Sequence, residues 1–531
     1  MTVKTILAIS ASAIILSGCF RHKAPETFPP EQITAAGELA ARLDRNLDRL
    51  ESDIYRPGAV FKDDDWPGDF VGRTILGTVL NSRAFGRTPL YLQTIIGDLP
   101  SHLNERSYLG PVYGGKDEQQ LSGHGWLLRG LCEYYGLTGD NSIIPVISGI
   151  VYNLFLPDPQ MYSSYPIDPE QRSSGNGAES GSIQDEVDGW RLSSDIGCVF
   201  IGMSGLIHAY GTLSSIPGID KDLLKGMKDC IERMLGRFRE IDPVAIQAQT
   251  HATLTACCGL VRYYGITGEK EWLELAEDRW KTYVAEGMTV NFENYNWFGR
   301  HDSWTEPCAI IDSYILACDL WRYTLDEGYR NLAELIYYNG ICHTQRHNGG
   351  FGCDNCPSAG DPYLKIHAYE AYWCCTMRGG EGLARVSESS YMHSGRSLFI
   401  PFFRGSELHS EGISLIQTTG YPFQGEAEIR ILDNPGGYDR LYLPSAPWME
   451  GMSVEVNGQA CRMDGNCLKR TLKAGDCIDI RFNMKEREDE VFNLIRRMRG
   501  PLVLADDGQT PLYHLMDSTV TGHDYKRKIL Y

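Results

Sequence analysis

The stretches LCEYYGLTGDNSIIPVI, from Leu131 to Ile147, and LVRYYGITGEKEWLELAEDRW, from Leu260 to Trp280, are copies of one pattern. In each copy, apolar residues at helical spacing lead to a Thr-Gly pair, and a second helical segment follows. A glycine directly after the last periodic residue is typical of a left-handed helix cap. A looser third copy, LWRYTLDEGYRNLAELIYYN, begins at Leu320. The pattern therefore predicts repeated helical hairpins.

The spacing of the copies predicts how the hairpins are arranged. The two clear copies start 129 residues apart, which leaves room for about three hairpins of ~40 residues each. Hairpins repeated in this way predict an (α/α) toroid over residues 20–393, whose inner helices line a central cleft; a straight solenoid is the alternative. Residues 171–190 are polar and rich in Gly and Ser, which predicts a long loop over that cleft.

After Ser394 the period of the apolar residues changes from helical to alternating. Five segments alternate in this way and are separated by Gly, Pro and Asn: RSLFIPFF, GISLIQTT, EAEIRIL, MSVEVNG and CIDIRFNM. Short strands at this spacing predict an antiparallel β-sandwich over residues 394–531. The expected fold class is thus α+β and multidomain, since 531 residues are too many for one core.

The first 19 residues form a candidate export signal. Lys4 is followed by an apolar run, too short to span a membrane, that ends in Leu16-Ser17-Gly18-Cys19. This order resembles a bacterial lipoprotein signal, with Cys19 lipidated after cleavage; an ordinary secretory signal is the alternative. We therefore expect a lipoprotein of the bacterial cell envelope, on the periplasmic or surface face of the outer membrane, that touches the membrane only through this lipid.

The net charge of the chain limits the classes of partner that it can bind. A formal net charge of −19 argues against nucleic acid and against an anionic membrane surface. The 29 Tyr and 10 Trp residues suit a carbohydrate cleft, but a large core uses the same residues, so this count alone decides nothing.

Adjacent cysteines in YEAYWCCTMRGGEG are the strongest sign of chemistry. Neighbouring Cα atoms lie ~3.8 Å apart across a trans peptide, whereas a disulfide needs about 4.4–6.8 Å, so a bridge between Cys374 and Cys375 would be strained. Two thiolates on one soft metal ion avoid that strain. Together with Glu306 and Cys308, which lie upstream in WTEPC, they predict a Zn²⁺ site.

Other cysteines are interpreted differently. Cys257 and Cys258 are also adjacent, but their neighbours are those of a buried helix, so we expect core thiols there. Cys353 and Cys356, in a Cys-x-x-Cys motif, leave a disulfide, a second metal site or a competing ligand set open. A hairpin disulfide between Cys461 and Cys467 also stays open. Buried free thiols are expected at the remaining positions: Cys132, Cys198, Cys230, Cys318, Cys342 and Cys477.

Several of these motifs together resemble a known family. SWTEPCAIIDSYILACDLWRY, ELIYYNGI and YWCCTMRGGEGLARV, with GDCIDIRFNMKERE and RRMRGPLVLADD in the strand-rich part, are similar to glycoside hydrolase family 127, the β-L-arabinofuranosidases and their relatives. The similarity extends over roughly residues 120–510. The resemblance implies an (α/α)6 toroid with β-sandwich domains, and a retaining exo-glycosidase whose nucleophile is a zinc-bound cysteine.

The resemblance also implies roles for individual residues. Glu306, Cys308, Cys374 and Cys375 match the zinc ligands, and Cys374 matches the nucleophile. The chemistry is reasonable because the thiolate is the reactive form of cysteine and a metal keeps it deprotonated. One carboxyl and one sulfur would then replace the usual pair of carboxylates of a retaining enzyme.

The remaining site residues follow from the same match. Glu293 corresponds to the general acid/base, with Asp302 as the alternative, and His124 and His251 correspond to residues that contact sugar hydroxyls. Arg378 is more consistent with a structural salt bridge than with a substrate contact. Two further departures from the family concern the substrate: Thr-Met-Arg-Gly-Gly follows the cysteine pair where many members have Pro-Pro-Asn, and the acid/base segment is short.

The sequence thus predicts a hydrolase that removes β-L-arabinofuranose or a related terminal sugar from oligo- or polysaccharides of plant type. Two rivals remain. One is a polysaccharide lyase or unsaturated uronyl hydrolase built on a toroid, which would not need the cysteine set. The other is a non-catalytic surface lipoprotein that binds glycans and uses zinc only to stabilise its fold.

Overall fold

The computed structural model describes residues 24–62, 65–172, 180–358, 361–505, 513–514 and 526–528. The expected signal peptide and Cys19 lie outside these residues. Within them, no helix combines the length and the apolar character that crossing a bilayer requires.

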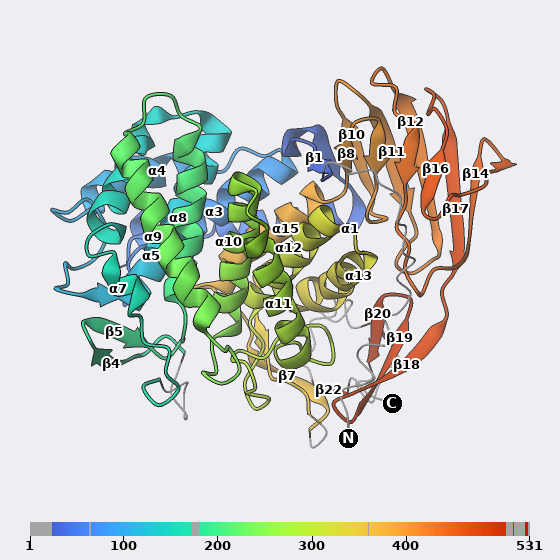
Figure 1. Ribbon diagram of the computed structural model, residues 1–531. Coiled ribbons are helices and arrows are strands. Elements are labelled where there is room, and N and C mark those ends of the chain that lie inside the picture. The colour runs from blue at the N-terminus through green and yellow to red at the C-terminus, as the bar shows by residue number, and fades with distance from the viewer. Residues whose placement is uncertain are drawn as a thin grey trace.

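A closed ring of helices forms the first part of the molecule (Figure 1). In the described part of the chain the ring has six members: α3 (Asp69–Phe85), α5 (Glu118–Thr138), α8 (Val199–Ser214), α10 (Thr250–Thr267), α12 (Pro307–Thr324) and α15 (Cys375–Glu388). Each packs against the next, and α15 packs against α3. A solenoid would leave its first and last helices apart, so the predicted toroid is confirmed.

An outer layer of helices covers this ring. It consists of α1 (Gly37–Leu50), α4 (Leu92–His102), α6 (Ile144–Ile150) with the π-helical η5 (Val151–Phe155), α9 (Lys221–Glu240), α11 (Lys270–Glu286) and α13 (Glu327–Ile336). The inner helices are buried along most of their length, whereas helices such as α1 and α9 alternate buried apolar and exposed charged residues. This difference is what an amphipathic outer layer over a buried ring requires.

The repeated sequence segments contain the turns that end the inner helices α5, α10 and α12. Gly139 and Gly268 end α5 and α10 in the left-handed conformation, at φ values of 66° and 76°, as the Thr-Gly pairs predicted. The third copy ends α12 differently, because Leu325 and not a glycine takes the left-handed position. Only two hairpins, α5–α6 and α8–α9, separate the two clear copies in the described chain, which corrects the expected three.

The insert at residues 171–190 explains that difference in spacing. Its described part is not a loop throughout: β4 (Ile183–Val187) and β5 (Trp190–Ser193) form a hairpin, and β5 pairs with β3 (Lys116–Asp117). Together with α7 (Gln160–Ser163), the insert lies between the end of η5 at Phe155 and the start of α8 at Val199, a length of chain similar to the ~40 residues of a further hairpin.

Two sheets pack together to form the β-sandwich. One has the order β1 (Glu26–Thr27), β8 (Met392–Ser394), β9 (Ser397–Phe399), β13 (Arg440–Tyr442), β16 (Cys467–Lys469). The other has the order β15 (Gln459–Ala460), β14 (Glu450–Val456), β17 (Cys477–Asn483), β12 (Glu426–Asp433), β11 (Ser414–Thr419), β10 (Ser406–His409), β2 (Ile33–Ala35). Alternate residues of β12 and β17 are buried between the sheets, as their sequence pattern predicted.

Two features of the sandwich were not expected. The strands β1 and β2 come from the N-terminal part of the chain, so the sheets extend across the predicted boundary at residue 394. The pair β9–β13 is parallel, although the other strand pairs of these two sheets are antiparallel in the described residues.

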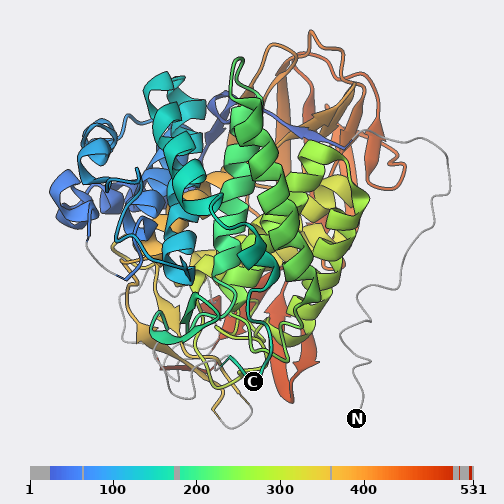
Figure 2. The same cartoon turned by 60° about the vertical axis from the view of Figure 1, so that its left-hand side comes forward.

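Smaller sheets lie at the lower end of the molecule in Figure 1, below the sandwich and the helices. One contains β18 (Glu486–Val491), β19 (Leu494–Arg499), β20 (Leu502–Ala505) and β21 (Tyr513–His514), and another contains β6 (Cys353–Asp354), β7 (Tyr363–Ala368) and β22 (Lys526–Lys528). Figure 2 shows the same strands behind the helices after rotation.

Hydrogen bonds join the strand-rich part to the helices. The π-helical η6 (Tyr337–Ile341) carries Asn339, whose Nδ2 donates to Pro501 O at 2.8 Å and whose Oδ1 accepts from Val503 N at 2.8 Å. Arg404 enters from the other side and donates to the Val386 carbonyl of α15 at 3.0 Å. The sheet of β18–β21 is therefore held to η6, and the sandwich is held to α15, which begins at Cys375.

Candidate active site

The four predicted ligands meet where α12 and α15 begin. Glu306 is the N-cap residue of α12 and Cys308 lies in its first turn, while Cys374 and Cys375 are the N-cap and first residue of α15. The Sγ atoms of Cys308 and Cys375 are 3.5 Å apart although 67 residues separate them in sequence. Helix N-termini favour anions, so both helix ends stabilise thiolates here.

A tight turn explains why two adjacent cysteines point into one site. The carbonyl of Ala371 accepts hydrogen bonds from the amides of Cys374, Cys375 and Thr376 at 3.3, 2.9 and 3.2 Å. This turn leaves the Sγ atoms of Cys374 and Cys375 3.3 Å apart, well beyond the ~2.05 Å of a disulfide. Both thiols are free.

One of the three thiols is set to ionise. Burial by itself would raise the pKa of Cys308, but hydrogen bonds from Cys374 and Cys375 and the charge of Arg73 hold it well below its usual range. Arg73 donates to the Cys308 Sγ at 3.4 Å. The pKa of Cys374 is raised, chiefly because it donates to Cys308.

Glu306 supports a metal at this cluster. It is 9% exposed, and its Oε2 atom is buried without a hydrogen-bond partner. Burial, with Cys308 nearby, raises its pKa. The ligand atoms of Glu306, Cys308, Cys374 and Cys375 all lie within 4.8 Å of one another. Zn–S bonds of ~2.3 Å in a tetrahedron place sulfur atoms slightly under ~4 Å apart, so the four residues fit Zn²⁺.

His251 lies next to the cluster and is firmly held. Its Nδ1 lies 2.6 Å from Asp312 Oδ2, and its ring stacks on Trp126 at 5.6 Å between centroids. Its Nε2 is 3.4 Å from Arg73 Nη1, the atom that also donates to Cys308. His251 thus touches the site through Arg73, and its contact with a sugar stays a prediction.

His124 does not fit its predicted role. Its Nε2 accepts from Leu109 N at 2.9 Å and its Nδ1 lies 2.8 Å from Gln120 O, so both ring nitrogens are used by backbone groups. The side chain is fully buried, and burial lowers its pKa to about 4. A neutral, fully bonded ring has no donor or acceptor left for a sugar hydroxyl, so His124 is structural.

The structure places the two candidate acid/base residues in different environments. Asp302 is mostly exposed and pairs with Arg300 at 2.8 Å, which removes it from the site. Glu293 is fully buried, and neither of its carboxylate oxygens has a hydrogen-bond partner. A turn orients it, in which Glu293 N donates to Thr289 Oγ1 at 3.1 Å. Its neighbour Asn294 accepts from Glu306 N at 3.0 Å, which places Glu293 beside the ligand segment.

The remaining assignments outside the cluster are mostly structural. Arg378 is fully buried and bonds to Asp312 and Glu381, as expected of a structural salt bridge. Cys257 is a buried free thiol in α10 and Cys258 beside it is partly buried. Cys353 and Cys356 are also free, so the structure shows no disulfide between them.

Three site residues were not found from the sequence. Arg73 and Asp69 form a buried ion pair at 2.7 Å on α3, but in sequence they read as an ordinary i,i+4 helix pair. Asp195, just before α8, is buried, and burial raises its pKa to about 7. Both its oxygens accept from Ser180 Oγ, at 2.8 and 2.9 Å, and its charge acts on Glu306.

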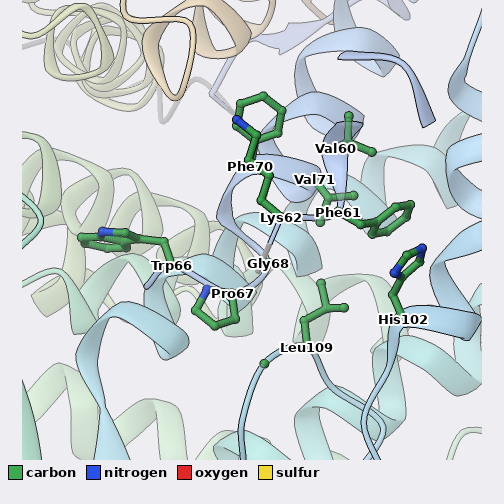
Figure 3. Close-up of a pocket in the computed structure, with 11 residues that line it drawn as sticks. Val60, Phe61, Lys62, Trp66, Pro67, Gly68, Phe70, Val71, His102 and Leu109 are labelled. Carbon is green, nitrogen blue, oxygen red and sulfur yellow. The ribbon is translucent and has the colours of Figure 1, made fainter. Parts of the chain in front are cut away.

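Exposed aromatic rings line the approach to Cys374. Tyr372 and Trp373 immediately precede it and are 39% and 50% exposed. Lys62 lies over the rings of Phe70 and Tyr372, at 3.8 and 5.4 Å from their centroids. Lys62 and Phe70 also line a cavity of about 180 Å³ at the start of α3 (Figure 3), which therefore borders the segment in front of the nucleophile candidate.

Comparison with known proteins agrees with this architecture. Residues 397–484, in the sandwich, match the family model described as "Beta-L-arabinofuranosidase, GH127 middle domain". The resemblance to glycoside hydrolase family 127 is confirmed. No curated protein matches at the level of sequence.

Solved structures extend the family 127 match to most of the chain. A GH127 β-arabinofuranosidase is 15% identical with a TM-score of 0.66, covering 91% of this chain and 86% of that one. A GH127 β-L-arabinofuranosidase from Geobacillus stearothermophilus T6 is 14% identical with a TM-score of 0.62, covering 88% and 80%. A protein described as a glycoside hydrolase matches at 14% identity and a TM-score of 0.65, covering 91% and 84%. These matches show a shared fold with family 127.

Proposed function

We propose that this protein is an exported, retaining exo-glycoside hydrolase that removes β-L-arabinofuranose, or a related terminal sugar, from plant-type glycans. The observation that carries the proposal is the buried cluster of three thiols and one carboxyl at the starts of α12 and α15. The toroid around it has the fold of the family 127 structures named above. Those structures are described as arabinofuranosidases, which supports this choice of sugar.

Cys374 is the best placed nucleophile of the three thiols. It is only partly buried, whereas Cys308 and Cys375 are inaccessible, and the exposed Tyr372 and Trp373 directly precede it in the chain. In the first step its Sγ forms a bond to the anomeric carbon as the bond from that carbon to the leaving oxygen breaks. In the second step water replaces the sulfur on the same face, so the configuration is retained.

A carboxyl group must supply the proton for the first step and accept one in the second. Burial and the neighbouring Asp354 raise the pKa of Glu293 well above its usual range, which favours the protonated form that an acid needs. That proton goes to the leaving oxygen, and the resulting carboxylate takes a proton from the attacking water. Asp195, with its pKa of about 7, is the competing candidate that an experiment must separate.

Glu306, Cys308, Cys374 and Cys375 would hold the zinc ion. When bound, Zn²⁺ supplies a charge that keeps thiols deprotonated at neutral pH and weakens the basicity of a departing thiolate. The donor set of soft sulfur atoms with one carboxylate is of the kind that zinc sites use. Arg73 adds positive charge from the protein itself.

Metal content and turnover together test the proposal. The purified mature protein is expected to contain about one zinc per chain and to release arabinose from aryl β-L-arabinofuranosides. Cys374→Ser and Glu306→Gln should lose or weaken the zinc, and Cys374→Ser should lower kcat by at least ~10³-fold. Cys461→Ser is the matched control, because Cys461 lies in the sandwich outside the cluster.

Each outcome separates one of the rival functions. Zinc binding without turnover of any glycoside would favour a glycan-binding protein with a structural metal. Turnover that survives Cys374→Ser would overturn the cysteine mechanism and direct attention to the carboxyl groups of the toroid. Labelling of cells with a lipid precursor, compared with a Cys19→Ala variant, tests the proposed lipid anchor and envelope location.

A further inference from the structure

A second group of buried ionisable residues lies beside the thiol cluster. It consists of Glu293 in the loop before α12, His343 in the short helix α14 (Cys342–Thr344), and Asp354 in β6. All three are at most 3% exposed. His343 Nε2 lies 3.0 Å from Asp354 Oδ2 and 3.9 Å from Glu293 Oε1. The proposed mechanism uses Glu293 but gives the other two no role.

The loop that carries Glu306 joins the two groups. Thr305 N donates to the Asp354 carbonyl at 2.7 Å, and Asp354 N donates to Thr305 Oγ1 at 3.0 Å. The thiol of Cys353, next to Asp354, acts electrostatically on both Glu306 and Glu293. Asp354 and His343 are thus fixed relative to the thiol cluster.

Charge balance decides between a metal and a proton at this second group. Arg346 Nη2 donates to Asp354 Oδ1 at 2.8 Å and is itself buried, so one of the two carboxylates already has a cation. A divalent ion placed among these residues would face that guanidinium at short range in a medium of low dielectric constant. The group is better satisfied by one proton on Glu293.

We propose that His343 and Asp354 are positioning residues that hold the Glu293 carboxyl group for proton transfer, with Arg346 anchoring Asp354. The proposal rests on the proposed function, because it assigns these residues to the acid of that reaction. His343 Nε2 lies within 3.0 Å of Asp354 Oδ2 and 3.9 Å of Glu293 Oε1, so a single ring nitrogen faces both carboxyl groups. The negative charge of Asp354 then disfavours a second negative charge on Glu293.

The groups around Glu293 shift its pKa in both directions. Burial raises its pKa most, Asp354 and the Cys353 thiol raise it further, and the Asn291 side chain and Arg346 lower it. The Cys356 thiol is close enough to feel the charge of Glu293, and the Tyr283 hydroxyl donates to the Glu293 carbonyl at 3.5 Å. Asp354 itself stays ionised: burial opposes this, but Arg346 and His343 lower its pKa to about 2.

The pH dependence of the reaction tests the inference, with two variants that should shift the pH profile in opposite directions. The basic limb of kcat/KM reports loss of the proton from Glu293. Asp354→Asn removes the negative charge and should move that limb about one to three pH units lower. Arg346→Met removes the positive charge and should move it higher. Asp302→Asn, an exposed acid in the same segment, should leave the profile unchanged.

A second measurement does not depend on activity. The carboxyl carbon of Glu293, assigned by its absence in Glu293→Gln, is titrated by ¹³C NMR in the zinc-loaded full chain. It should be protonated at neutral pH in the wild type and titrate at lower pH in Asp354→Asn. His343→Asn should lower kcat about tenfold with little change in KM, and His343→Gln should restore part of it.

The outcomes distinguish this inference from the proposed function. If NMR shows the shift but no arabinofuranoside is cleaved, the positioning pair stands and the substrate is wrong. If Glu293 is ionised at neutral pH and Asp354→Asn does not shift it, the inference is overturned. Loss of a second metal equivalent in Asp354→Asn, with zinc retained at the thiols, would overturn it in favour of a metal site. If Asp354→Asn does not fold, the pH profile of Arg346→Met and the kinetics of His343→Asn and His343→Gln test the inference instead.

Discussion

At the scale of single residues, Arg73 connects three parts of the candidate site. Its Nε donates to Asp69 at 2.7 Å, its Nη1 donates to Cys308 at 3.4 Å, and its guanidinium lies 4.2 Å from the centre of the Trp126 ring. Three thiolates and a carboxylate would give a zinc-loaded site a formal charge of about −2, which Arg73, in contact with Cys308, would partly offset. Its charge is therefore part of the environment of the metal.

Replacing Arg73 by methionine should weaken zinc binding. Met fills similar space but cannot donate to Cys308, so the excess negative charge is no longer offset, and we expect zinc affinity to fall about 10- to 100-fold. Competition with a chromogenic chelator measures this. Arg300→Met, which removes a partly buried arginine that pairs with Asp302 outside the thiol cluster, is the control. Unchanged zinc affinity in Arg73→Met would mean that the contact with Cys308 is incidental.

The residue scale also shows which parts of the site the sequence could predict. Cys374 and Cys375 were predictable because adjacent cysteines have few structural uses, and Glu306 with Cys308 followed from the resemblance. His343 and Asp354 could not be found, since a lone His and a lone Asp carry no spacing signal and meet only through the fold. His124 was misassigned because sequence cannot show that Leu109 N and Gln120 O already occupy its ring.

At the scale of elements, the π-helix η6 packs against α12 and α15, the helices that carry the thiol cluster. A widened turn of this kind is frequent at functional sites. Asn339 in η6 holds the backbone of β20, and the next residue, Gly340, faces the loop of Glu293. A Cβ atom on Gly340 would lie 2.6 Å from Ile310 Cγ2 in α12 and 3.2 Å from the Phe292 carbonyl. One glycine thus lets η6, α12 and the acid-bearing loop approach one another.

Gly340→Ala should disturb both stability and catalysis. The methyl group must displace Ile310 or the Phe292–Glu293 backbone, so we expect a loss of about 1–3 kcal/mol in the free energy of unfolding and a lower kcat. Gly136→Ala is the matched control, because nothing lies within 4 Å of its Cβ position in α5. That variant should gain about 0.5–1 kcal/mol by the helix propensity of alanine. Urea unfolding and steady-state kinetics measure both variants. A Gly340→Ala variant as stable as the wild type would contradict the packing argument.

The elements themselves were predictable to different degrees. Helical periodicity and Thr-Gly caps sufficed for α5 and α10, and alternation sufficed for β12 and β17. The parallel pairing of β9 with β13, and the recruitment of β1 and β2 into the sandwich, depend on contacts between distant segments. No local pattern in the sequence encodes such partners.

At the scale of the whole molecule, the toroid must close by joining its last inner helix to the first ones. Buried charges contribute to this closure away from the thiols. Glu133 of α5 accepts from Arg83 of α3 at 3.3 Å and from Arg385 of α15 at 2.8 Å, while Glu388 of α15 accepts from Arg83 at 3.2 Å. Since α3, α5 and α15 are distant in sequence, this network links the two ends of the ring.

Glu133→Gln should destabilise the protein at neutral pH and much less in acid. Burial alone would raise the pKa of Glu133, but Arg385, His208 and Arg83 hold it well below the usual range. The folded-state pKa is thus lower than the unfolded value of ~4.3, so this stabilisation is fully present above pH ~4.3 and is lost as the pH falls toward the folded value. Replacing Glu133 removes one of the two carboxylates that Arg83 and Arg385 share and leaves them with Glu388, so we expect a loss of about 2 kcal/mol at pH 7.

Urea unfolding at several pH values measures this difference. The gap between wild type and Glu133→Gln should narrow steadily below pH ~4.3, because the wild-type carboxylate then takes up a proton on unfolding. Glu232→Gln provides the control, since its pair with Lys228 on α9 is half exposed and should contribute under ~1 kcal/mol at any pH. A gap between wild type and Glu133→Gln that stays constant from pH 7 to below pH ~4 would show that Glu133 is not charged in the folded ring. Closure would then rest on apolar packing of α15 against α3 alone.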